Sequence, residues 1–363
     1  MAAVDAVCSA NRAARMSALS SLGAYFRLRC DANDVTRYES TLTNALFNCI
    51  RRGKCEERCR AATALALMAW SLGEADDVFD KARRYAEKVL TTEMKKGDDY
   101  SEFVLAISII YFVESPESYD TLALCRLLLD SAEHERSVLH RAACVSAWTF
   151  LFSTVPPTEL GGSAIVEAAL QTMHTYLSDE VVAVRVAAGE AVTMMFLRCN
   201  LGALSVISSH DSPITTDGSA SRLDGSGSGS GLLVILARMK EIEKNLGDGE
   251  NRKSKGDRSS LRKEFKEYLR IVNGEAPKPQ KIALPNGQTI DVESYEDIVF
   301  LNRARAVLGD GFLRSMLSNP ILHQVLDFEP VEHDVERFCH EEKRRAEKAR
   351  AKDRRSKNER SAF

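Results

Sequence analysis

The residues with the clearest capacity for chemistry form a basic run between Lys343 and Arg360, with ten Lys or Arg side chains and three acids. On a helix, Arg344, Lys348, Lys352 and Arg355 would share one stripe and could follow a row of phosphates. No aromatic residue interrupts the run, so base stacking is not indicated. We interpret these residues as candidate RNA- or phosphate-binding groups: Lys343, Arg344, Arg345, Lys348, Arg350, Lys352, Arg354, Arg355 and Lys357.

Two other interpretations of this run stay open. Charge runs are common on solvated helices and in disordered chain ends, where they bind nothing. The basic clusters at 343–345 and 354–355 also fit a nuclear import signal, although such clusters have low specificity.

A second basic cluster comprises Arg51, Arg52 and Lys54, at the turn expected between two helices. Side chains at such a turn are exposed and can contact phosphates, so these three are also candidates for RNA binding. The simpler alternative is that they only keep the turn soluble.

The sequence does not favour a metal or catalytic centre. Cys49, Cys55 and Cys59 lack CxxC spacing and have no His between them, so we expect them to be buried small hydrophobic residues. His134 and His340 each precede a Glu, but neither has the second His of an HExxH motif. Nucleophiles and bases could pair in space, but nothing in the sequence singles out a nucleophile with its base. We predict a protein that is not an enzyme and has no cofactor or metal.

The elements that would position these groups are repeated helix pairs. Small-residue and apolar segments recur at 60–70, 103–110, 141–145 and 185–188, at intervals of roughly forty residues. Amphipathic stretches precede them at 38–50, 78–90, 119–130 and 164–176. This pattern predicts an all-α, HEAT/armadillo-like α-α superhelix with an extended binding surface. Trp70, Trp148, Met194 and Met195 should lie in its core, together with the face formed by Val184, Ala188, Ala191 and Met195.

The rest of the chain divides by composition. Gly and Ser dominate near residue 230, and Asn286-Gly287 between alternating apolar residues predicts a β-hairpin over 281–292. We expect a flexible N-terminus at 1–19, repeats at 20–202, a Gly/Ser-rich linker or loop at 203–231, a further repeat helix at 232–246, a polar linker at 247–258, a small C-terminal helical module with the hairpin at 259–330, and a basic helix or tail at 331–363.

Bulk properties are compatible with this organisation. The formal net charge is −3, so the positive charge matters locally rather than overall. Nine scattered cysteines favour reduced thiols in the cytoplasm or nucleus over a disulfide framework. Residues 1–22 are rich in Ala, Ser and Arg, which leaves a mitochondrial transit peptide open beside a partly helical N-terminus. No apolar run reaches the length of a membrane span.

Residues 46–73, from Leu46 to Gly73, resemble the interferon-related developmental regulator family. The resemblance resumes at Ser260–Phe265, at the Asn286-Gly287 hairpin and at Leu308–Leu313, followed by Leu317, Asn319 and Leu322, so that it extends over 20–328. The N-terminal segment and the Gly-Ser insert depart from animal members, and the basic tail aligns with no motif.

The resemblance implies a helical-repeat N-terminal domain, a family-specific C-terminal domain and no enzymatic activity. It also implies either ribosome binding that silences translation or transcriptional co-regulation in the nucleus. The sequence therefore leads to two main hypotheses, beside a third in which the protein is a purely architectural adaptor that ignores nucleic acid. The first is a ribosome-associated regulator that contacts ribosomal RNA, and the second is a nuclear co-regulator whose concave surface gathers transcription factors or deacetylase complexes.

Overall fold

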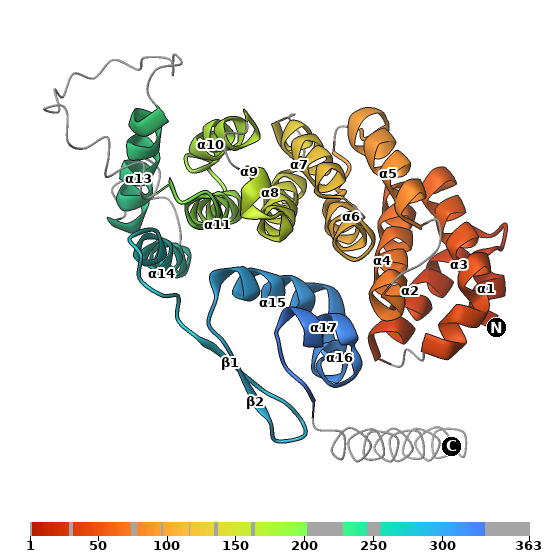
Figure 1. Ribbon diagram of the computed structural model, residues 1–363. Helices are drawn as coiled ribbons and strands as arrows, with labels where there is room; N and C mark the ends of the chain where they lie inside the picture. The colour runs from red at the N-terminus through yellow and green to blue at the C-terminus, as the bar shows by residue number, and fades with distance from the viewer. Residues whose placement is uncertain are drawn as a thin grey trace, which may run out of the picture.

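A computed structural model describes residues 2–28, 32–73, 78–95, 97–115, 117–133, 137–160, 164–201, 228–244 and 255–330. Within these residues the chain is helical apart from one two-stranded antiparallel sheet. The predicted all-α helical-repeat fold with a C-terminal hairpin is confirmed. Figure 1 shows the helices stacked side by side in an arc, with the last helices of the chain lying inside it.

Each repeat pairs an outer helix with an inner one, and the inner helices pack on one another in chain order. The inner helices are α2 (Arg12–Leu28), α4 (Cys55–Leu72), α6 (Ser101–Glu114), α8 (Val138–Thr154), α11 (Val182–Arg198) and α14 (Lys255–Val272). Their outer partners are α1 (Ala2–Val7), α3 (Ala32–Arg52), α5 (Val78–Lys88) with its π-helical extension η1 (Val89–Glu93), α7 (Ser118–Glu133), α10 (Ala164–Tyr176) and α13 (Ser228–Lys244); the short α9 (Pro157–Leu160) lies between α8 and α10.

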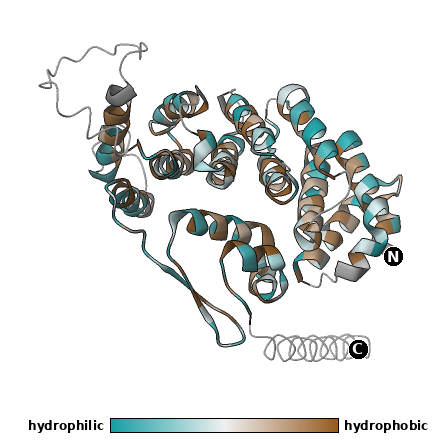
Figure 2. Ribbon diagram, in the orientation of Figure 1, coloured by the Kyte–Doolittle hydropathy of each residue, from teal (hydrophilic) through white to brown (hydrophobic). Residues whose placement is uncertain are grey.

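The inner helices are buried on several sides because each lies between two others. In α4 the residues from Ala64 to Trp70 are all buried, and the small side chains among them let neighbouring helices approach closely. The predicted core residues Trp70, Trp148, Met194 and Met195 are at most 1% exposed, which confirms them. In Figure 2 the outer helices α3 and α5 are largely hydrophilic on their outward side.

The N-terminus differs from the expectation. Residues 1–19, expected to be a flexible and partly helical N-terminus, contain α1 and the first half of α2. Val7 and Leu19 are buried, and α1 packs on both α2 and α3. Only a few side chains of this segment pack against the next repeat, so its hydrophobicity is low. The sequence pattern therefore did not reveal the helix pair.

The last helix pair also differs from the expected boundary. We assigned residues 259–330 to one C-terminal module, but α14 pairs with α13 and packs against α11 as a further inner helix. The contact with α11 is close at Gly189, where an added Cβ would lie 2.8 Å from the Tyr268 ring and 3.0 Å from the Phe265 ring. A glycine at 189 therefore lets α14 join the stack.

The predicted hairpin is confirmed, with strands β1 (Gln280–Ala283) and β2 (Thr289–Val292) in a register that pairs Ile282 with Ile290. Its turn uses Pro285, Asn286 and Gly287. The Gly287 amide donates to the Leu284 carbonyl at 3.0 Å, and Gly287 has a φ of +88°. Only the glycine takes a positive φ, as in a three-residue loop that closes with a bulge.

The remaining helices, α15 (Tyr295–Leu308), the single turn η3 (Gly309–Gly311), α16 (Phe312–Ser318) and α17 (Pro320–Val325), occupy the concave side of the arc (Figure 1). The Phe300 ring on α15 lies 6.0 Å from Trp70, 5.3 Å from Phe112 and 6.3 Å from Phe150, measured between ring centroids. These partners come from α4, α6 and α8. The inner helices and the C-terminal helices thus share one hydrophobic core.

The C-terminal helices also reach the first repeat. The Arg27 Nε donates to the Val307 carbonyl at 2.8 Å, and the Arg314 guanidinium donates to the Leu28 carbonyl. A Cβ on Gly311 would lie 2.0 Å from the Arg27 carbonyl oxygen, so the two backbones touch there. The concave side is therefore covered by the chain's own helices from α2 to α8.

Candidate nucleic-acid interface

The sequence-derived RNA-binding candidates fall into two groups in the structure. Those from Lys343 to Lys357 lie outside the described residues. Arg51, Arg52 and Lys54 lie at the turn from α3 to α4, and all three side chains are exposed, as expected. We call these three residues the α3–α4 basic turn.

A buried glycine shapes this turn. The Gly53 amide donates to the Cys49 carbonyl at 2.8 Å and ends α3. A Cβ at this position would lie 2.4 Å from that carbonyl oxygen and 2.9 Å from the Glu57 Cγ. No side chain fits at this position, which requires a glycine. Gly53 is buried, and the cations on either side of it are exposed.

Arg58 stabilises the backbone of the turn. Its Nε donates to the Gly53 carbonyl at 2.8 Å, and its Nη2 donates to the Arg51 carbonyl at 3.4 Å. The same guanidinium pairs with Glu93 and contacts the Tyr100 hydroxyl at 3.4 Å, so it ties the turn to the next repeat. Lys88 and Arg58 together lower the pKa of Glu93, which keeps this pair charged.

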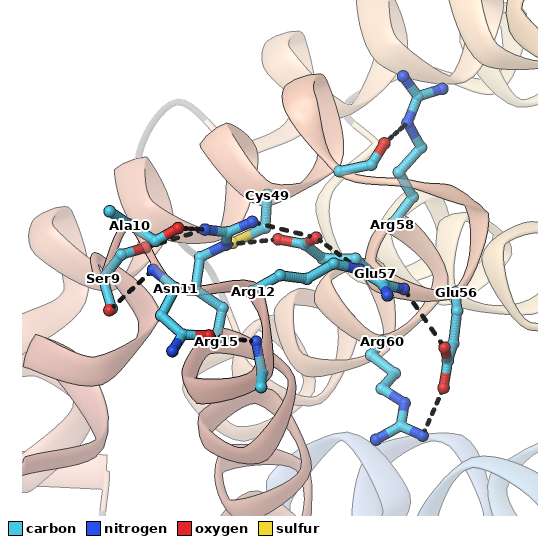
Figure 3. Close-up of polar contacts among 12 residues, drawn as sticks. Ser9, Ala10, Asn11, Arg12, Arg15, Cys49, Glu56, Glu57, Arg58 and Arg60 are labelled. Atoms are coloured by element: carbon cyan, nitrogen blue, oxygen red, sulfur yellow. Dashed lines mark hydrogen bonds and ion pairs between the residues drawn. The ribbon is translucent and has the colours of Figure 1, made fainter.

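Other arginines close to the turn are engaged in internal ion pairs, as Figure 3 shows. Glu57, which is 1% exposed, accepts from the Arg15 Nε at 2.6 Å, and Glu56 accepts from the Arg60 Nη2 at 2.8 Å. Arg15 also donates to the backbone carbonyls of Ser9 and Ala10 and so fixes the α1–α2 connection. These charges stabilise the stack, whereas the α3–α4 basic turn faces solvent.

Within the described part of the chain, Arg52 and Lys54 form no ion pair, and the Arg51 Nη2 donates to the Asn48 Oδ1 at 2.9 Å. The neighbouring loop brings two acids to the same end of the stack. Cys55 donates from its Sγ to the Asp99 carbonyl at 3.2 Å, and Asp98 lies beside it in sequence. The cations are thus available to an anionic ligand, but part of their potential is offset by these acids.

The three cysteines near the turn behave as packing residues. Cys49 and Cys59 are buried and Cys55 is half-buried, so the expectation holds fully for two of them. Burial raises the pKa of Cys49 to about 11, and it raises the pKa of Cys59 further. Protonated thiols are poor metal ligands and nucleophiles. Among the described residues, no group of three or more His, Cys, Asp or Glu side chains could hold a metal ion.

One potential catalytic arrangement escaped the sequence analysis. The His140 Nε2 lies 3.0 Å from the Ser131 Oγ and 3.3 Å from the Cys144 Sγ. All three residues are at most 2% exposed, so a substrate cannot reach them. Ser131 belongs to α7 and the other two to α8, and no local motif signals that these side chains meet. The cluster joins an outer helix to its inner partner.

The comparison with known families bears on the whole helical stack. The family described as Interferon-related developmental regulator (IFRD) matches residues 1–273, which run from before α1 to the residue after α14. The chain belongs to the interferon-related developmental regulator family. Membership supports a regulatory role in development or gene expression.

A curated relative agrees with this assignment. Interferon-related developmental regulator 2 of Mus musculus is 26% identical over 210 residues, which cover 53% of this chain and 47% of that protein. The matched region thus spans about half the length of the relative. The family match coincides with the six helix pairs described above and ends before the hairpin, although the C-terminal helices are packed into the same core.

No helix within the described residues combines the length and the apolar character required to cross a lipid bilayer.

Proposed function

We propose that this interferon-related developmental regulator is a non-enzymatic regulator of gene expression that acts as a helical-repeat scaffold on the ribosome, with basic residues contacting ribosomal RNA. The observation that carries the proposal is the α3–α4 basic turn, whose three cations are exposed on a backbone that Arg58 and the buried Gly53 hold in place. Exposed cations on a large surface suit binding to an RNA-rich particle better than catalysis on a small substrate. The basic run at 343–357, which lies outside the described residues, would add further phosphate contacts.

The surface available for this role is restricted by the fold. The inner faces of α4, α6 and α8 receive Phe300 and are covered. A large partner therefore docks on the outer helices, on the turns between helices or on the two ends of the stack. Lys or Arg residues at turns and ends are positioned for such docking without any rearrangement of the core.

Sedimentation of the full-length protein on gradients at low and high salt tests the proposal. We expect co-migration with ribosomes at low salt and loss at high salt, and weaker co-migration of a chain truncated after Pro330. The proposal fails if the full-length protein stays out of ribosomal fractions at low salt.

The second candidate function is nuclear co-regulation of transcription through peptide-in-groove contacts. Family membership supports a regulatory role in gene expression, but the groove that this function needs is filled by α15–α17. A co-regulator would then use a different surface. Nuclear accumulation that is lost when Arg344, Arg345, Arg354 and Arg355 are changed to Ala supports this candidate, and a tagged protein that stays in the cytosol under all conditions refutes it.

A further inference from the structure

The end of the stack carries a second basic surface that the sequence analysis did not single out. Among the α14 residues whose side chains the structure describes, four are cations, Arg262, Lys263, Lys266 and Arg270, and they fall within roughly 100° of one another around the helix axis. The first three are exposed and Arg270 is half-buried. We call these four residues the α14 basic stripe.

The packing of α14 fixes the direction in which this stripe points. Leu261, Phe265 and Tyr268 are buried, and the last two press on Gly189 of α11. The stripe lies on the opposite side of the helix, which is the side where another repeat would stack. A charged end face prevents a further repeat from stacking on the last one. This role requires polar side chains but does not depend on the sign of their charge. Here the exposed charges on the described part of the helix are of one sign, and the exposed Glu275, which follows the helix, pairs with Arg270 at its end.

Acids neutralise one end of the stripe and leave Lys263 and Lys266 without an ion pair among the described residues. Glu264 lies on the inward side, near Glu190 of α11. Arg270 pairs with Glu275 at 2.8 Å and with Glu267 at 3.0 Å, and Glu267 also pairs with Lys278 at 3.2 Å and accepts from the Lys278 amide. Lys278 is 70% exposed and so adds a fifth cation beside the stripe. Arg262 lies 3.9 Å from Glu243 of α13, a weak exposed pair.

The chemistry of the stripe narrows the class of partner. Helices that bind membranes insert apolar or aromatic side chains, and protein interfaces depend on buried aromatic or Arg anchors. None of the large exposed hydrophobic residues of the described chain lies on α14. A row of cations about 12 Å long, on a helix that exposes no large apolar side chain of its own, fits a phosphate backbone. The exposed Leu233 and Val234 lie on the adjoining α13.

We propose that the α14 basic stripe binds the phosphate backbone of RNA, independently of sequence and without base stacking. This inference rests on the proposed function and adds a second contact, at the opposite end of the stack from the α3–α4 basic turn. Two separated contacts on one rigid arc would orient the protein on a large RNA particle, because binding at one end brings the other close to its site.

The test measures binding of a purified duplex RNA to the full-length protein over a series of salt concentrations. The variant replaces Arg262, Lys263 and Lys266 by Gln. The matched control replaces Arg83 and Arg84 of α5 and Arg126 of α7 by Gln, which removes the same charge from exposed positions. We expect the α14 variant to lower the slope of log affinity against log salt by about 2–3, because each lost phosphate contact reduces the slope by roughly 0.7–0.9. The control variant should have the same slope as the wild type.

An unchanged slope in the α14 variant overturns the inference, and so does an equal loss in both variants, which would indicate a general charge effect. Displacement of RNA by polyglutamate at equal charge concentration also overturns it, since that result assigns the stripe to acidic proteins. Ribosome sedimentation is measured separately on the same proteins. If the full-length protein stays out of the ribosomal fractions while its α14-dependent RNA binding is intact, the proposed function is refuted and the present inference is not.

Discussion

The side-chain amide of Asn319 donates a 2.8 Å hydrogen bond to the backbone carbonyl of Trp70, 249 positions earlier in the chain. Trp70 lies in the last turn of α4, where helix carbonyls lack partners within the helix. The Asn319 Oδ1 in turn accepts from the amides of Ile321 and Leu322 and caps α17. One side chain thus satisfies the end of an inner helix and the start of a C-terminal helix.

Replacing Asn319 by Ala should lower the free energy of unfolding by about 1–3 kcal/mol, because the carbonyl of Trp70 and the cap of α17 lose their partners in a buried site. Urea denaturation followed by circular dichroism measures the change. Ser318→Ala is the control, since this neighbouring side chain is exposed and bonds only within α16. Equal effects of the two substitutions would contradict the role of Asn319.

Phe300→Ala should cost about 3–5 kcal/mol, as expected when a buried aromatic ring leaves a cavity. Its ring is 3% exposed and contacts aromatic side chains of three inner helices. Leu313→Ala on the exposed surface of α16 should cost under about 0.5 kcal/mol. If both variants unfold at the urea midpoint of the wild type, α15 does not contribute to the shared core.

Two glycine-to-alanine substitutions should act in opposite directions. Gly189→Ala places a Cβ 2.8 Å from the Tyr268 ring, and forced repacking of this kind costs about 1–3 kcal/mol. Gly23→Ala in α2 meets only the Arg27 Nη1, at 4.0 Å, so helix propensity should stabilise the protein by about 0.5–1 kcal/mol. Thermal unfolding of both variants tests the sign. Destabilisation by Ala at both positions would show that α2 tolerates no added methyl group.

Glu190 should make stability depend on pH. Burial raises the pKa of its carboxyl to about 7, against the opposing effect of Arg303, and the groups around it are Glu264 and Tyr268 on α14 and Tyr295 and Arg303 on α15. Between about pH 4.3 and 7 the folded state holds a proton that the unfolded state releases, so stability falls as pH rises through this range.

Glu190→Gln should therefore be less pH-sensitive than the wild type between pH 5 and 8, and the more stable of the two at pH 8. Urea titrations at several pH values measure the difference. Glu167→Gln, on the exposed side of α10, serves as the control and should follow the wild type. A constant difference between Glu190→Gln and the wild type at every pH would argue against titration of Glu190.

The α3–α4 basic turn should contribute to RNA affinity independently of the tail. Changing Arg51, Arg52 and Lys54 to Gln should reduce the salt dependence of RNA binding by about 2–3 in logarithmic slope, with no change in the urea midpoint. Filter binding over a salt series provides the measurement. An unaltered slope would leave these side chains as solubilising residues of an ordinary turn.

The sequence by itself determined the helical repeat, the hairpin and the buried positions of Trp70 and Trp148, because periodicity and turn residues act over short distances along the chain. It also located Arg51, Arg52 and Lys54 on an exposed turn. The placement of α15–α17 inside the arc was decided only by tertiary packing. The contacts of Phe300 with Trp70 and of Gly311 with Arg27 join residues far apart in sequence, and no local pattern encodes them. The outward direction of the α14 basic stripe is likewise a tertiary result, since the fit of Phe265 and Tyr268 on Gly189 sets the rotation of that helix.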